Sequence, residues 1–135
     1  MDSPALSGRC LCGRVRFRAA APLYAPTLCH CESCRRAQGA HAIAWVTVAA
    51  TSLEYTAELP LEHPSSPGVR RGFCGHCGTP LSYRTERRPD EVDLTLACVD
   101  QAAALAPADH IWMEDALPWD RPADGLPQFR RARGG

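Results

Sequence analysis

Two short segments, Gly8-Arg-Cys-Leu-Cys-Gly13 and Phe73-Cys-Gly-His-Cys-Gly78, decide how this chain folds. In each segment two cysteines are separated by one or two residues, and a glycine directly follows the second cysteine. Glycine tolerates the left-handed backbone that a turn around a metal ion often requires. Zinc prefers four tetrahedral ligands, and each segment supplies two of them. We therefore expect one Zn²⁺ in a closed structural site that is held by Cys10, Cys12, Cys74 and Cys77.

A third segment, Cys29-His-Cys-Glu-Ser-Cys34, places three cysteines within six residues but contains no fourth. Three protein ligands with one open position are typical of catalytic zinc, whereas structural zinc is normally saturated. We therefore expect a second Zn²⁺, with one open position, at Cys29, Cys31 and Cys34. Alternatively, His30 or a distant histidine completes a second structural site. The backbone that points Cys29 and Cys31 inward points His30 away, which favours a place behind the ligands or facing solvent.

The other cysteine and histidines are expected to lie outside both sites. Cys98 continues the period-two pattern of Val92, Leu94 and Leu96, which predicts a strand and a core position for the thiol. His76 lies inside the turn from Cys74 to Cys77 and is expected to face solvent. Spacing assigns no role to the remaining histidines, which are His41, His63 and His110.

Polar residues near the third segment are candidates for holding a substrate. Arg35 and Arg36 directly follow the last cysteine, where they either pair with a carboxylate or a coordinated sulfur, or remain surface charges. Glu32 and Ser33 lie between cysteines and could relay a proton, although only their adjacency indicates this.

Composition bounds the fold and its partners. A chain of 135 residues suits one domain, which we expect to span 1–135 with a core of about 5–130. Acidic and basic residues number 15 each and lysine is absent, which argues against a nucleic acid or a membrane as partner. The N-terminus lacks the pattern of a signal peptide, so we expect a cytoplasmic protein, in which closely spaced cysteines bind metal rather than form disulfides.

The apolar pattern predicts a mainly β fold. Apolar residues alternate with polar or small ones around Val15 and Phe17, and again around Ile43 and Trp45. Twelve prolines and ten glycines interrupt most windows long enough for a helix, leaving short helices over 100–105 and just after Cys34. The tail from residue 107 is expected to cover the sheet irregularly with Trp112, Trp119, Leu126 and Phe129.

An open zinc site with three thiolates favours the binding of a substrate thiol. Three thiolates donate so much electron density that the zinc is a weaker Lewis acid than zinc bound by three neutral histidines, which disfavours hydrolysis. A substrate thiol in the fourth position would lose its proton and keep a nucleophilic sulfur at neutral pH. A nearby electrophile would then form a carbon–sulfur bond with that sulfur.

Longer motifs around the cysteines and in the tail form a recognisable set. They are Gly8-Arg-Cys-Leu-Cys-Gly-Arg-Val15, Cys29-His-Cys-Glu-Ser-Cys-Arg-Arg36 with Gly39, Phe73-Cys-Gly-His-Cys-Gly-Thr-Pro-Leu81, His110-Ile-Trp112, Pro118-Trp119 and Leu126-Pro-Gln-Phe129. Over nearly the whole chain, this set resembles the glutathione-dependent formaldehyde-activating enzymes and their relatives, which include the centromere protein V group.

The resemblance implies a fold, a metal content and an activity. The fold is a β-tent zinc fold of antiparallel sheets with zinc knuckles. Residues that match Cys10, Cys12, Cys74 and Cys77 bind structural zinc in the family, and those that match Cys29, Cys31 and Cys34 bind a more labile zinc at the active site. The activity is condensation of formaldehyde with glutathione to S-hydroxymethylglutathione, the reverse of a carbon–sulfur lyase reaction. Expected partners are therefore glutathione or another small thiol, and an aldehyde.

Two other functions compete with this enzyme. The first is a non-catalytic zinc module that binds a protein or another macromolecule, as the centromere-associated relatives suggest. The second is thiol redox chemistry at Cys29, Cys31 and Cys34. The sequence does not indicate an oligomeric state.

Overall fold

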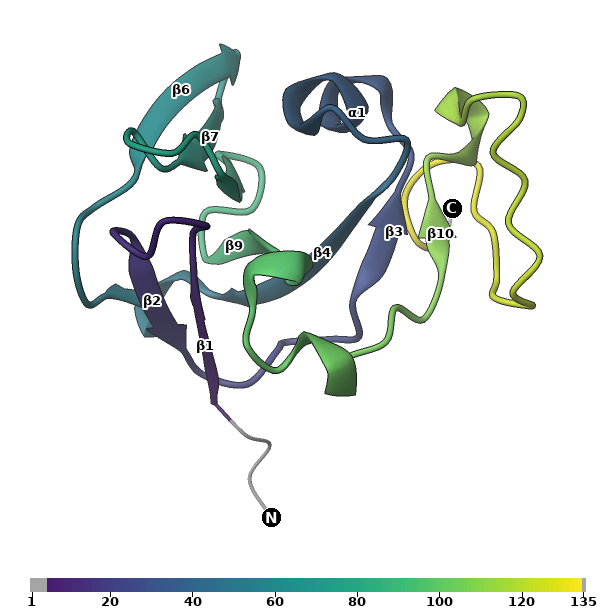
Figure 1. The fold of residues 1–135 in the computed structure, drawn as a ribbon. Helices are drawn as coiled ribbons and strands as arrows, with labels where there is room; N and C mark the ends of the chain where they lie inside the picture. The colour runs from purple at the N-terminus through teal and green to yellow at the C-terminus, as the bar shows by residue number, and fades with distance from the viewer. Residues whose placement is uncertain (1–4, 135) are drawn as a thin grey trace.

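The computed structural model describes residues 5–134, which form mainly β-strands, as the alternating pattern predicts (Figure 1). The strands are β1 Leu6–Arg9, β2 Arg16–Ala19, β3 Thr27–Cys29, β4 Ile43–Ala49, β5 Glu54–Tyr55, β6 Leu61–Ser66, β7 Val69–Phe73, β8 Pro80–Thr85, β9 Glu91–Thr95 and β10 His110–Ile111. A three-stranded sheet has the order β1-β2-β5, and a seven-stranded sheet has the order β10-β3-β4-β9-β8-β7-β6. Neighbouring strands are antiparallel, except that β10 pairs in parallel with β3.

Strand β4 shows how the larger sheet divides its two faces. Val46 and Val48 lie in the main core, whereas Trp45 and Thr47, which alternate with them, line a cleft on the opposite face. In the neighbouring strand β9 the core residues Val92 and Leu94 flank Asp93, which lines the same cleft. The alternation in the sequence therefore gives one face to the core and the other to the cleft.

The main core lies between the two sheets. The smaller sheet contributes Leu6, Phe17 and Ala19, and the larger one contributes valines and leucines of β4, β8 and β9. Val46, Val48 and Leu94 are fully buried. Burial of such side chains contributes about 1.5–3 kcal/mol each. Cys10 and Cys74 belong to this core, so one cysteine group is part of the packing between the sheets.

Helical segments are short and differ in part from those predicted. Helix α1 spans Glu32–Gln38 and begins before Cys34 rather than after it, because Cys31 caps its N-terminus. Between 100 and 105 only three residues are helical, in the 3₁₀ turn η3. The other 3₁₀ turns are η1, η2 and η4; the bounds of the four are Ala50–Ser52, Leu96–Cys98, Ala102–Ala104 and Met113–Asp115.

The prediction of a strand that continues to Cys98 was wrong. Strand β9 ends at Thr95, and the chain then turns in η2. The turn places Cys98 against the main core, where it is half-buried rather than fully buried. Its thiol faces the carbonyl oxygen of Pro80 at 3.7 Å.

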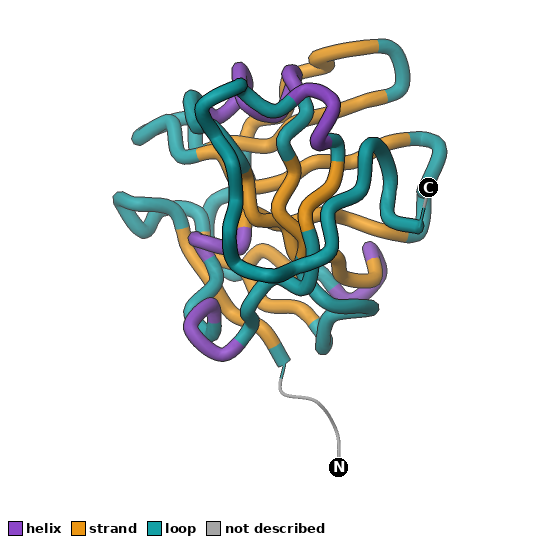
Figure 2. Tube along the Cα trace, turned by 90° about the vertical axis from the view of Figure 1, so that its right-hand side faces the viewer, coloured by secondary structure: helices purple, strands orange, loops and turns teal. Residues whose placement is uncertain are grey.

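The tail from residue 107 runs along β3 and returns beside β10 (Figures 1 and 2). Trp112 packs against the buried cluster that contains Ile43 and Trp45, as expected of a cover over the sheet. Trp119, however, is 70% exposed, whereas the side chain of the neighbouring Asp120 is largely buried. None of the helices within residues 5–134 has the length and apolar character needed to span a membrane.

Candidate functional site

Four cysteine sulfurs meet where the two sheets approach each other. The Sγ atoms of Cys10, Cys12, Cys74 and Cys77 all lie within 4.8 Å of one another. Cys10 directly follows β1 and Cys74 directly follows β7, so the group joins strands of different sheets. Gly13 and Gly78 both have φ of 81°, the left-handed conformation that the sequence predicts after each pair.

Backbone N–H groups point at these sulfurs. The N–H of Val15 lies 3.3 Å from Cys10 Sγ, and those of His76 and Cys77 lie 3.4 Å from Cys74 Sγ. Hydrogen bonds from the Thr79 hydroxyl and backbone lower the pKa of Cys77 to about 5. Four sulfurs at these distances, with donors that stabilise thiolates, fit the coordination of one zinc ion.

Three further sulfurs meet at the start of α1. Cys29 ends β3, Cys31 is the N-cap of α1, and Cys34 lies in its first turn. Their Sγ atoms lie within 4.8 Å of one another, and no fourth Cys, His, Asp or Glu of residues 5–134 joins them. The Cys34 N–H donates to Cys31 Sγ at 3.4 Å, so this sulfur replaces the oxygen that usually caps a helix. The group therefore offers three ligands on one short segment.

The protonation of the three thiols indicates that this group suits a cation. Hydrogen bonds with Cys29 and Cys34 lower the pKa of Cys31 to about 2. Hydrogen bonds with Cys31 and Cys34 raise the pKa of Cys29. The neighbouring thiols thus favour a thiolate at Cys31 and oppose the ionisation of Cys29, and a bound cation would offset that opposition. The donor set fits Zn²⁺, which thiolates hold well.

The three-sulfur group lies in the wall of a cleft with a volume of about 780 Å³. All three cysteines line the cleft, together with the aromatic side chains of Trp45, Tyr83, Trp112 and Tyr24. Trp45 and Tyr83 lie 6.1 Å apart between ring centroids. A cleft of this size, with apolar walls and a few polar groups, is typical of a small-molecule site.

One row of side chains crosses the sheet beneath the cleft. Register pairs join Arg71 of β7 to Tyr83 of β8, Tyr83 to Asp93 of β9, and Asp93 to Thr47 of β4. All four residues line the cleft. The Thr47 hydroxyl donates to Asp93 at 2.6 Å, and Arg88 donates to both Asp93 oxygens at 2.7 and 3.3 Å.

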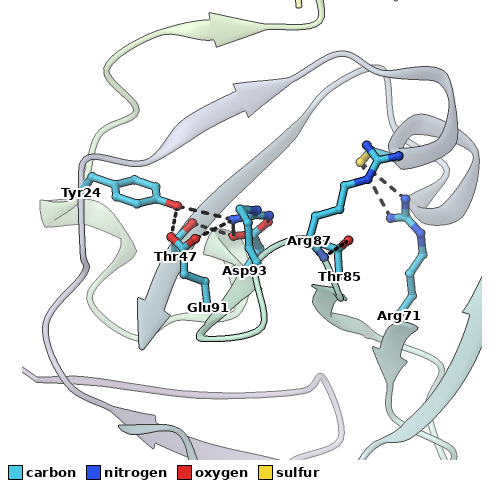
Figure 3. A network of polar contacts seen from close by, with 9 residues as sticks. Tyr24, Thr47, Arg71, Thr85, Arg87, Glu91 and Asp93 are labelled. Carbon is cyan, nitrogen blue, oxygen red and sulfur yellow. Dashed lines mark hydrogen bonds and ion pairs between the residues drawn. The ribbon is translucent and has the colours of Figure 1, made fainter. Parts of the chain in front are cut away.

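Away from the sulfur group, hydrogen bonds and ion pairs connect the polar side chains at the other end of the cleft (Figure 3). Arg88 also lies 3.7 Å from Glu91, and the Tyr24 hydroxyl donates to the same carboxylate. Arg133 pairs with Asp109 and lies 5.6 Å above the Tyr24 ring. At this end of the cleft, both arginines are therefore paired with carboxylates.

Arg71 is a cleft residue that the sequence did not indicate. Its Nη1 and Nη2 atoms lie 3.8 and 3.7 Å from Cys34 Sγ, and Nη2 lies 3.5 Å from the Ser33 hydroxyl. Its Cζ atom lies 4.9 Å from the centroid of the Tyr83 ring. Arg71 is three residues before Cys74, but no spacing rule connects it to Cys34. Only the register of β7 with β8 places it there.

Of the two places expected for His30, behind the ligands or facing solvent, the structure excludes the second: the ring is buried and lies outside the sulfur group. His30 is 1% exposed, and its Nε2 forms a hydrogen bond of 2.9 Å with Nδ1 of His110. His110 Nε2 is in turn 2.7 Å from Asp124. On the other side, His30 Nδ1 lies 3.3 Å from Asp120, which also binds His41 at 2.7 Å. The tail covers the side of His30 that the sequence leaves open to solvent.

The remaining candidates lie outside the centre of the cleft. Arg36 pairs with Glu32 on the surface of α1, and Arg35 lies on a different, shallower pocket near His41. Glu32 is exposed and does not line the cleft, whereas the Ser33 hydroxyl lies 3.5 Å from Cys31 Sγ. His76 is exposed, as predicted, and His63 lies on the exposed edge strand β6.

Comparison with known proteins gives concordant results. The family model described as glutathione-dependent formaldehyde-activating enzyme matches residues 5–115. A protein of Halomonas elongata, named "Putative glutathione-dependent formaldehyde-activating enzyme", is 29% identical over 124 residues, which cover 84% of this chain and 78% of that protein.

A solved structure shows the same fold. The crystal structure of a Rhodobacter sphaeroides protein superposes with a TM-score of 0.59 at 20% identity, covering 91% of this chain and 98% of the other. At this identity the likeness concerns the fold alone.

The match to the family model ends at residue 115, so the tail residues Asp120, Asp124 and Arg133 lie beyond it.

Proposed function

Because this chain belongs to the glutathione-dependent formaldehyde-activating enzyme family, we propose that it is a zinc-dependent enzyme acting on thiol–aldehyde adducts. The reaction forms or cleaves a carbon–sulfur bond, as in the interconversion of glutathione and formaldehyde with S-hydroxymethylglutathione. In the cleavage direction it is a carbon–sulfur lyase reaction. The family name and the name of the Halomonas elongata relative support glutathione and formaldehyde as substrates.

The two sulfur groups would hold two zinc ions with different tasks. Cys10, Cys12, Cys74 and Cys77 would saturate one ion and tie the sheets together in one zinc-binding domain that spans 1–135, with a core of about 5–130. Cys29, Cys31 and Cys34 would hold the other ion with one position open. Zinc there would lower the pKa of a substrate thiol and keep its sulfur nucleophilic at neutral pH.

The observation that carries this proposal is that the incomplete sulfur group lines the cleft. All three of its cysteines border the volume of about 780 Å³, so a ligand in the cleft can reach them. Trp45, Tyr83 and Trp112 form apolar walls beside them. These walls would orient the carbon chain of the thiol and keep water from the reacting carbon.

The experiment that tests the function is NMR exchange spectroscopy of formaldehyde mixed with a panel of thiols, with and without the zinc-loaded protein. The adducts form spontaneously, so the protein-free exchange rate is the baseline. We expect a higher exchange rate with at least one thiol, and loss of this increase in Cys31→Ser. The matched control is Cys98→Ser, because Cys98 lies outside both sulfur groups. No acceleration with any thiol would contradict the proposal and favour a non-catalytic zinc module.

A further inference from the structure

Three arginines line the cleft, and Arg71 differs from the other two. Arg88 pairs with Asp93, and Arg133 pairs with Asp109. Within residues 5–134, Arg71 makes no ion pair with a carboxylate: its Nε donates to the Ser65 hydroxyl at 3.1 Å, and its other nitrogens face Cys34 and Ser33. A half-buried guanidinium thus keeps its charge available at the sulfur group.

The backbone and the Tyr83 ring hold Arg71 in this position. In β7 its side chain is on the cleft face, and the neighbouring Arg70 is exposed and pairs in register with Arg84 instead. Tyr83, opposite Arg71 on β8, lies beneath the guanidinium at 4.9 Å. A cation over an aromatic face is attracted to it, which restricts the guanidinium to the region beside Cys34.

We propose that Arg71 is a catalytic residue whose guanidinium stabilises the negative charge that develops on the aldehyde oxygen. This inference rests on the proposed function. An aldehyde oxygen lies two bonds from the sulfur that attacks the carbon. A guanidinium in contact with the sulfur group can therefore reach that oxygen when the attacking sulfur is held there. The role is that of a preorganised donor at an oxyanion.

The step balances without any further reactant. The thiol first loses its proton to solvent, and a lone pair of the thiolate then forms the bond to the carbonyl carbon. The π electrons of the carbonyl move to oxygen, which takes a proton from water and becomes the hydroxyl of the adduct. In the cleavage direction the hydroxyl loses this proton, the carbonyl re-forms and the carbon–sulfur bond breaks towards sulfur. The guanidinium keeps its protons throughout, because arginine stays charged in proteins.

A different role for Arg71 would be to bind a carboxylate of the substrate. The two roles differ in their dependence on the thiol. A residue that acts on the aldehyde oxygen affects every thiol equally, because each adduct has that oxygen. A residue that binds a substrate carboxylate affects only the thiols that carry one. The position of the guanidinium at Cys34, next to the reacting sulfur, favours the first role.

The test compares Arg71→Met and Arg71→Gln with wild type in the NMR exchange assay, using glutathione, cysteine and 2-mercaptoethanol. Arg70→Met is the matched control, since it removes an arginine from the same strand but outside the cleft. We expect kcat/KM to fall about 10²- to 10³-fold in both Arg71 variants with every thiol that wild type uses, as when an oxyanion donor is removed. Arg70→Met is expected to stay within about twofold of wild type. Zinc content and melting temperature show whether each variant is folded. If Arg71→Met does not fold, the activity of Arg71→Gln decides the test.

A binding measurement gives a readout apart from activity. Thioacetate carries a partly negative oxygen two bonds from its sulfur, as the adduct does, and has no separate carboxylate, whereas ethanethiol carries no such oxygen. By calorimetry, we expect Arg71→Met to weaken the binding of thioacetate at least about tenfold and to leave that of ethanethiol unchanged. Equal Kd values for thioacetate in variant and wild type would overturn the inference.

The activity results separate this inference from the proposed function. Full activity of both Arg71 variants, or a loss restricted to thiols with a carboxylate, would overturn the role at the aldehyde oxygen and leave the proposed function standing. A wild-type protein that accelerates no reaction would overturn the proposed function and this inference together.

Discussion

The four-sulfur group lies within the main core, whereas the three-sulfur group lies at the edge of a cleft. Cys10 and Cys74 are each 1% exposed and pack among the residues between the sheets. Cys29 and Cys34 pack in a smaller cluster with Ile43 and Trp45. The same residue type therefore occupies two settings, one between two sheets and one beside a space for a ligand.

The connectivity of the two groups differs as much as their surroundings. Cys12 and Cys74 are 62 residues apart, and their sulfurs lie 3.8 Å from each other. Cys29 and Cys34 belong to one six-residue segment that needs no distant partner. A metal in the first group would close a long loop and stabilise the fold, whereas a metal in the second would constrain little beyond the segment. On the proposed function, connectivity and the number of ligands, rather than ligand chemistry, would distinguish the site that stabilises the fold from the site that reacts.

The largest expected effect tests this difference with one substitution in each group. Cys10→Ser should leave the protein largely unfolded, because structural zinc contributes on the order of 10–16 kcal/mol. Cys29→Ser, also at a buried cysteine, should stay folded and lose the acceleration of adduct exchange. Far-UV circular dichroism with thermal melting checks both variants. Equal melting temperatures for the two would remove the distinction between the groups.

A smaller effect is expected from the core that surrounds the four-sulfur group. Leu94 is fully buried, and Leu94→Ala should lower the free energy of unfolding by about 2–5 kcal/mol through lost contacts and a cavity. Exchange activity per folded molecule should stay unchanged, because Leu94 faces the core rather than the cleft. Urea unfolding measures the free energy of unfolding. If the fully folded variant lost activity, the main core would affect the cleft directly, which would contradict this prediction.

A similar or smaller loss is expected at the other group from His30→Phe. This change removes the hydrogen bond to His110 and leaves a buried ring nitrogen unpaired, so it should cost about 1–3 kcal/mol. His63→Phe on the exposed strand β6 is the control and should change stability by at most about 0.5 kcal/mol. Urea unfolding compares the two variants. If both behave like wild type, the buried pair does not anchor the tail to the cysteine segment.

The smallest effect is expected at the end of α1. Gly39 has φ of 63° with open space around its Cα, so Gly39→Ala should cost about 1–2 kcal/mol from backbone strain alone. Gly39→Asn should cost less, since asparagine adopts this conformation more readily. Chemical denaturation distinguishes the two variants. An alanine variant as stable as wild type would mean that the left-handed cap is not needed to position Cys34.

Short-range patterns in the sequence predicted the parts of the molecule that depend on neighbouring residues. Spacing predicted the group of Cys29, Cys31 and Cys34, and the glycines after Cys12 and Cys77 have the expected backbone. Alternation identified β4 and most of β9. In these cases one local rule determines the conformation. The meeting of Cys12 with Cys74, 62 residues away, was instead predicted from the four ligands that zinc requires.

Contacts between distant parts of the chain were not predictable in the same way. His30 meets His110 across 80 residues, and Arg71 reaches Cys34 across 37. The sequence correctly predicted that His30 points away from the sulfurs. Only the path of the tail, however, determines that the His30 ring is buried rather than exposed to solvent. Likewise, Trp119 is 70% exposed although the side chain of the neighbouring Asp120 is largely buried. These outcomes depend on packing that no local pattern encodes.

Stepwise zinc removal tests most directly whether the two sulfur groups have different tasks. The protein loaded with two zinc ions is titrated with a mild chelator while released zinc, circular dichroism and adduct exchange are recorded on the same sample. We predict that one equivalent of zinc leaves first and abolishes the acceleration, while the circular dichroism spectrum stays that of the folded protein. Release of both ions in a single step, with unfolding from the first equivalent, would contradict the account.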